Sequence, residues 1–288
     1  MPTMYDTFDE ENFITLLKGE PGTRKSTSAL SWPTPQYWFS WDRKMSSLRI
    51  PMANWGINIG DVIHDDYRDW STAEKKLRAL NQNCNFKTVI VDSLTSCASS
   101  IMQQTKRMKS GQTRKSGAQS GKMIAGISVN ELEDYNAEAS ALQDLLAMLK
   151  DLQTEKKVHV ILIAHVIKAE YMQAGQTHIS RTIWTAAKRV PAMIDSQMNE
   201  AYHFNIESDF DVDAEGSYAI LTQHTGRDYA RTGLPLPKKI IFGDEPLFST
   251  YIKPAMDELK KLKPTVRPTS TSLETTVTST DGAWEDNA

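Results

Sequence analysis

The stretch Gly19-Glu-Pro-Gly-Thr-Arg-Lys-Ser-Thr27 decides how this chain folds. It follows a short apolar run, residues 13–17, and comes close to the pattern G-x-x-x-x-G-K-[ST]. In that pattern the backbone N–H groups of the loop wrap phosphates where a strand passes into a helix. One position departs from it, because Arg24 stands where the pattern has its last glycine. The stretch predicts a nucleoside triphosphate site between a strand and a helix.

Each residue of this loop has an expected role. Lys25 reaches the β- and γ-phosphates, and the Ser26 hydroxyl holds Mg²⁺. Arg24 fits only if its side chain points outward or onto an anion, because glycine there avoids crowding near the phosphates. The loop therefore favours nucleotide binding over fast hydrolysis. The residues expected to contact the nucleotide are Gly19, Gly22, Thr23, Arg24, Lys25, Ser26 and Thr27.

The spacing of apolar runs predicts an α/β fold. Runs rich in β-branched residues, typical of buried parallel strands, cover residues 13–17, 88–91 and 158–164, with a weaker one at 37–39. Helical patterns at 72–80 and 131–153 lie between them. The alternation indicates a mainly parallel central sheet with helices on both faces. Residues 201–206 and 217–223 read as an antiparallel pair added at the C-terminal side, and 238–242 as a further strand.

Polar residues end several of the expected strands, at the edge where open α/β sheets bind ligands. Asp92 follows the run 88–91 and is expected to hold Mg²⁺ together with Ser26. Its neighbour Ser93 replaces the acidic residue that many motor ATPases carry there. Asp42 is then the candidate catalytic base, with an ordinary loop aspartate as the alternative. His165 ends the run 158–164 as a γ-phosphate sensor or as a structural histidine.

Length and composition predict one large domain and a tail. Residues 1–263 form the expected core, with a mobile basic loop at about 106–130. Residues 264–288 hold ten Ser or Thr and end in an acidic stretch, so they are expected to stay disordered. The net charge of −3 gives no global nucleic-acid signature. No apolar run approaches the ~20 residues of a membrane span. Two cysteines without metal-ligand spacing suggest a reducing, cytoplasmic location.

Local basic clusters make single-stranded DNA the expected partner. Between Ser93 and Asn130 there is no acidic residue, and Tyr171 and Trp184 are the candidates for base stacking. A solvated basic face is the alternative. The candidate DNA contacts are Lys106, Arg107, Lys109, Arg114, Lys115, Lys122, Arg181, Lys188 and Arg189. Arginines of the turn 225–233 are candidates for a finger that reaches a neighbouring subunit's nucleotide.

Taken together, these motifs resemble the RecA-type P-loop NTPase core, over roughly residues 13–242. The pair Asp92-Ser93 is typical of that core, and the closest resemblance is to phage-encoded minimal RecA-like ATPases, including single-strand annealing proteins. The resemblance implies ATP and Mg²⁺ as cofactors and a homo-oligomer, either filament or ring. It assigns nucleotide contacts to Lys25, Ser26 and Thr27, Mg²⁺ to Asp92, sensing to His165 and action in trans to Arg231. Asp42 stands where the family places a catalytic glutamate, which predicts slow hydrolysis.

The leading hypothesis is a DNA-dependent ATPase of phage recombination or replication, acting by annealing or strand exchange in the cytoplasm of the bacterial host. Two alternatives stay open. One is an ATP-independent annealing module with a vestigial nucleotide site, and the other is a replicative helicase or helicase loader of related fold. A single-strand-binding or replication protein is a further candidate partner, and no membrane contact is expected.

Overall fold

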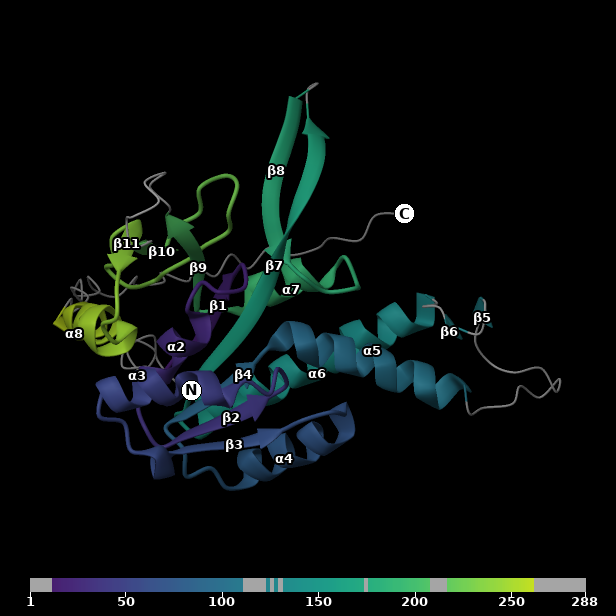
Figure 1. Ribbon diagram of the computed structural model, residues 1–288, viewed down its shortest axis with the longest axis horizontal. Helices are drawn as coiled ribbons and strands as arrows, with labels where there is room; N and C mark the ends of the chain where they lie inside the picture. Colours follow the sequence, from purple (N-terminus) through teal and green to yellow (C-terminus); the bar gives the residue numbers. More distant parts are fainter. Residues whose placement is uncertain are drawn as a thin grey trace, which may run out of the picture.

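The strand before the phosphate loop lies inside the sheet rather than at its edge. β1 (Ile14–Gly19) is hydrogen-bonded in parallel to β7 (His159–Gln173) on one side and to β9 (Glu200–Glu207) on the other. The computed structural model describes residues 12–110, 123–124, 127–128, 132–173, 176–207 and 217–261. Figure 1 shows the sheet running through the molecule with helices packed against it.

The nine-stranded sheet has the order β11-β10-β9-β1-β7-β4-β2-β3, with β8 paired to β7. The strands from β9 to β3 run parallel, and β10 and β11 are antiparallel additions. The predicted mainly parallel sheet with antiparallel strands at the C-terminal side is confirmed. The remaining strands of this sheet are β2 (Gln36–Ser40), β3 (Val62–Asp66), β4 (Thr88–Asp92), β8 (Gln176–Ile183), β10 (Ser217–Leu221) and β11 (Lys239–Phe242).

Helices cover both faces because alternate strand residues point to opposite sides. Leu16 belongs to one core cluster and Leu17 to the other. The first cluster packs under α4 (Trp70–Gln82), α5 (Leu94–Ser110), α6 (Leu132–Glu155) and α7 (Val190–Gln197). The second packs under α2 (Lys25–Leu30), α3 (Arg49–Asn54) and α8 (Lys253–Lys261). Short elements complete the description: η1 (Met45–Leu48), η2 (Ile59–Asp61), η3 (Phe248–Ile252), β5 (Met123–Ile124) and β6 (Ile127–Ser128). None of the helices in these described ranges has the length and apolar character to cross a bilayer.

Two segments differ from the sequence-based expectation. The strand predicted to end at 164 continues as β7 to Gln173, and with β8 it forms a hairpin that projects from the body (Figure 1). The basic loop predicted from about 106 is wrong at its start, because residues 106–110 belong to α5. Basic residues in the last turn of a helix are favoured by the helix dipole, and α5 carries Arg107 and Lys109 there. Residues 111–122 and the tail 262–288 lie outside the described residues.

A buried ion pair fixes the end of β1 immediately before the loop. The Lys18 side chain is completely buried, and its Nζ lies 2.8 Å from Asp195 Oδ1 on α7. The same ammonium lies 4.6 Å from the centre of the Tyr229 ring. Burial lowers the pKa of Lys18, while the Asp195 carboxylate opposes this. Removing one partner would therefore leave a buried charge without its counterion.

We predict that Asp195→Ala lowers the free energy of unfolding by about 3 kcal/mol, because breaking a buried pair costs more than replacing it. The double variant Lys18→Met/Asp195→Leu should recover most of that loss, since no charge is left buried. Urea denaturation of the three proteins measures the difference. Equal losses in the single and double variants would contradict this role for the pair.

Candidate nucleotide site

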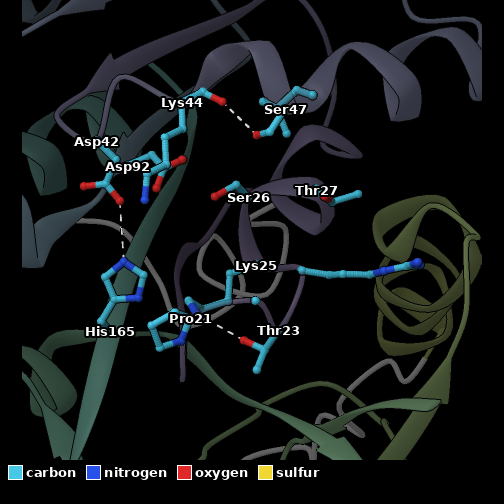
Figure 2. A pocket seen from close by; sticks show the side chains of 13 residues that line it. Pro21, Thr23, Lys25, Ser26, Thr27, Asp42, Lys44, Ser47, Asp92 and His165 are labelled. Carbon is cyan, nitrogen blue, oxygen red and sulfur yellow. Dashed lines mark hydrogen bonds and ion pairs between the residues drawn. The ribbon is translucent and has the colours of Figure 1, made fainter. Parts of the chain in front are cut away.

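The strand register brings the predicted site residues to one edge of the sheet. Gly19 at the end of β1 lies beside His165 of β7, and Asp92 at the end of β4 lies beside Ser40 of β2. A cavity of about 270 Å³ opens there (Figure 2). Its lining residues are Pro21, Gly22, Thr23, Arg24, Lys25, Ser26, Thr27, Asp42, Lys44, Ser47, Leu48, Asp92 and His165.

The loop itself has the backbone that a phosphate cradle needs. Gly22 has φ +83°, a conformation that glycine adopts without strain. Gly19 is required by close packing, because a Cβ there would lie 2.4 Å from the carbonyl oxygen of Phe204. Lys25 Nζ donates to the carbonyl oxygens of Gly19 at 2.9 Å and Glu20 at 2.7 Å. The ammonium is thus held inside the loop, where burial lowers its pKa to about 8 against the attraction of nearby carboxylates.

Arg24 is the residue that departs from the motif. Its side chain points onto an anion, as expected from the sequence. Its φ of +63° is the left-handed conformation for which the motif normally uses glycine. The guanidinium points onto an anion, since it donates to the carbonyl oxygen of Gly243 at 2.8 Å and pairs with the Asp244 carboxylate. It also lies 4.3 Å from the centre of the Tyr218 ring. Arg24 therefore ties the phosphate loop to the strands β10 and β11.

Ser26 lies beside Asp92 in the pocket, as Figure 2 shows. Burial raises the pKa of Asp92 to about 6, although a hydrogen bond with the Ser26 hydroxyl lowers it. The hydroxyl and the carboxylate are oxygen ligands of the kind that Mg²⁺ prefers, next to a loop suited to phosphates. These two residues fit the predicted metal site.

Asp42 and His165 form a second polar pair beside Asp92 (Figure 2). His165 Nε2 lies 3.5 Å from Asp42 Oδ2, and the Ser93 hydroxyl donates to Asp42 Oδ1 at 3.1 Å. Burial raises the pKa of Asp42, but hydrogen bonds from His165, Ser96 and Ser93 outweigh it and lower the pKa to about 2. A carboxylate with so low a pKa is a weak base at neutral pH. The pair can orient a polar group but cannot readily remove its proton.

Arg181, predicted as a DNA contact, joins the hairpin to the loop region. Its Nη1 lies 3.0 Å from Asp228 Oδ2, and its Nε lies 3.6 Å from Glu20 Oε1 of the phosphate loop. Asp228 also lies 3.9 Å from the fully buried His203. With two carboxylates beside it, the Arg181 guanidinium is engaged within the protein in this conformation.

The other predicted DNA contacts that the structure describes lie at the end of α5 and just before α7. Lys106, Arg107 and Lys109 lie on α5, and Lys109 pairs with Glu133 and Asp134 at 3.0 and 2.8 Å. Lys188 and Arg189 are exposed just before α7. Arg114, Lys115 and Lys122 lie outside the described residues, as does the Tyr171 side chain. Arg231 is exposed outside the pocket and is bonded through its backbone to Ala201 of β9.

Besides Pro21 of the loop itself, sequence reasoning missed three residues that line the cavity: Lys44, Ser47 and Leu48. They belong to the segment that follows Asp42, where the chain turns into η1. Their position just after a strand at the carboxyl edge was the available signal.

Comparison with known proteins gives two distant structural likenesses and no sequence relative. No family model and no curated protein matches the chain. Among solved structures, the RadB recombinase matches with a TM-score of 0.45 and 13% identity, over 81% of this chain and 89% of that one. The flagellar accessory protein FlaH from Methanocaldococcus jannaschii matches with a TM-score of 0.41 and 12% identity, over 81% and 86%. Likenesses with such low TM-scores and identities carry no conclusion about fold or function.

We predict that Arg24→Gly keeps nucleotide affinity and is about 1 kcal/mol more stable to unfolding than Arg24→Ala. Both lose the exposed pair with Asp244, but only glycine is free of left-handed strain. Calorimetric titration and urea denaturation measure the two quantities. A loss of affinity of about tenfold or more in Arg24→Gly would mean that the guanidinium contacts the nucleotide.

We predict that Asp92→Asn stabilises the protein when neither metal nor nucleotide is present. The folded pKa is about 6 and the ordinary value is 3.8, so folding favours the neutral form of Asp92. The destabilising effect of the carboxylate is absent below pH 4, grows up to about pH 6 and is complete above it. Asp92→Asn should therefore be about 1–3 kcal/mol more stable than the wild type at pH 7.5.

Urea denaturation in EDTA at pH 4 and at pH 7.5 tests this prediction. The advantage of Asp92→Asn should be present at pH 7.5 and largely lost at pH 4. The same advantage at both pH values would show that ionisation of Asp92 is not its cause.

Proposed function

We propose that this chain is a RecA-type protein that binds ATP with Mg²⁺, hydrolyses it slowly and acts on single-stranded DNA. The observation that supports it best is the convergence of Lys25, Ser26, Asp92 and His165 on one cavity, from the start of α2 and two different strands. A motif matched by chance would not gather these side chain types at the same sheet edge.

In this proposal the loop holds the triphosphate and Lys25 neutralises it. Lys25 Nζ leaves the carbonyl oxygens of Gly19 and Glu20 for the phosphate oxygens, which compensate its desolvation better. Gly22, Thr23 and Thr27 border the same cavity. Ser26 and Asp92 hold Mg²⁺, which when bound neutralises charge that develops on the phosphates.

Slow hydrolysis follows from the state of the candidate base. Asp42 is held by His165 and Ser93, and its pKa of about 2 makes it a weak acceptor for a proton from water. Turnover then requires that His165 releases Asp42, or that water is positioned without strong base catalysis. His165 thereby acts as the sensor that relates the γ-phosphate to β7 and the hairpin beyond it.

Binding of single-stranded DNA is supported by the hairpin, the basic end of α5 and the exposed pair Lys188 and Arg189. The hairpin continues the strand that carries His165, and Lys188 and Arg189 follow the segment that is bonded to His165 through Trp184, so nucleotide state and DNA binding can influence each other. Assembly into a filament or ring, with the exposed Arg231 reaching a neighbour's nucleotide, belongs to the same proposal. Phage recombination or replication is the biological setting that the sequence resemblance suggests.

We expect single-stranded DNA to stimulate ATP turnover by the wild type, and Lys25→Ala to lose turnover by about a hundredfold or more. The reason is that a preorganised charge at the reacting phosphate contributes on the order of 10²–10³ in rate. Phosphate release with and without oligo-dT measures it. Lys150→Ala, an exposed lysine on α6, is the matched control and should behave as the wild type.

Two outcomes would decide against this function. If Lys25→Ala anneals complementary strands as well as the wild type, the nucleotide site is vestigial and the chain is a binding module. If the wild type unwinds a forked duplex with a fixed direction, the chain is a helicase.

A further inference from the structure

A second cavity lies between α5 and the segment that follows the hairpin. Its volume is about 220 Å³, and the Trp184 side chain at its rim is 57% exposed. One wall is a single face of α5, and the other is the segment after β8. The residues that the argument uses are Thr95, Ser99, Gln103 and Lys106 on α5, and Trp184 and Thr185 opposite.

The Trp184 wall is built on a buried carboxylate. Glu138 of α6 is 1% exposed and accepts hydrogen bonds from the backbone N–H groups of Ala186 at 3.0 Å and Ala187 at 2.7 Å. Burial raises the pKa of Glu138, and these two bonds oppose the rise. The carboxylate oxygens of Glu138 thus hold the segment after β8, and this segment forms the Trp184 wall opposite α5.

Both walls are bonded to the backbone of His165. The Trp184 N–H donates to the His165 carbonyl oxygen at 2.8 Å. The His165 N–H donates to the Thr95 hydroxyl oxygen at 3.0 Å. The His165 ring in turn contacts Asp42 in the nucleotide pocket. A ligand that separates or clamps the two walls therefore acts on the residue that faces the nucleotide.

The chemistry of the cavity fits one unstacked nucleobase with its phosphate. An exposed indole offers a stacking surface, and Ser99, Gln103 and Thr185 offer donors and acceptors for a base edge. Lys106 lines the cavity, and the exposed Lys188 and Arg189 follow the Trp184 wall. Cations beside an aromatic platform are the combination by which single strands are held.

We propose that this cavity binds one base of single-stranded DNA, stacked on Trp184, with an adjoining phosphate paired to Lys106. Occupancy is relayed to the nucleotide pocket through the backbone of His165. This inference rests on the proposed function, which supplies single-stranded DNA as the ligand. It adds the site at which one base is held.

The first test is the affinity for fluorescein-labelled oligo-dT, measured by anisotropy with a slowly hydrolysed ATP analogue. Trp184→Ala should bind about 5- to 100-fold more weakly, the effect of losing one stacked base. Trp184→Phe should keep most of the affinity, because it retains an aromatic face. Lys106→Ala should reduce the salt dependence of binding by about one ion, whereas the control Lys150→Ala should not.

The second test locates the bound base in the wild-type protein, so its result does not depend on whether a variant folds. Irradiation of the complex with an oligonucleotide that contains 5-iododeoxyuridine should cross-link the base to the peptide that holds Trp184, as read by mass spectrometry. A cross-link only to other peptides, with Trp184→Ala binding as the wild type, overturns the inference and leaves the proposed function intact. Failure of the wild type to bind oligo-dT overturns the DNA part of the proposed function and this inference with it.

Discussion

The parallel pairing of β1 with both β7 and β9 is the constraint on which the candidate site depends. The register places Gly19 between His165 and Phe204, and a Cβ on Gly19 would lie 2.4 Å from the Phe204 carbonyl oxygen. Glycine at this position therefore lets the chain leave the sheet as a loop. Because β7 also pairs with β4, Asp92 ends at the same edge. Strand pairing thus brings the lysine, the carboxylates and the histidine together.

The same geometry makes the ligand-free site unfavourable for its charges. Burial lowers the pKa of Lys25 to about 8 and raises that of Asp92 to about 6, so both groups are held against their preferred ionisation. A bound triphosphate and cation would relieve both, which couples binding to stability. Asp42 differs, because its hydrogen bonds more than compensate burial. Such a site is suited to binding and to slow turnover.

The sequence could predict the parallel strands and the cavity because buried β-branched runs ended in polar residues. The hairpin after His165 could not be predicted, since its strands leave the sheet and no core imposes an apolar alternation on them. The helix α5 was not predicted, and its basic end was assigned to a loop because a run without acidic residues resembles a solvated segment. Arg181 carries a charge that the sequence shows, but its partner Asp228 lies 47 positions away and is known only from the fold.

Calorimetric titration of the wild-type protein with a slowly hydrolysed ATP analogue tests the central claim most directly. In the presence of Mg²⁺ the account predicts saturable binding at one site per chain, and much weaker binding when EDTA replaces the metal. Absence of binding, or binding of equal strength with and without Mg²⁺, would contradict the assignment of Lys25, Ser26 and Asp92 to one nucleotide site.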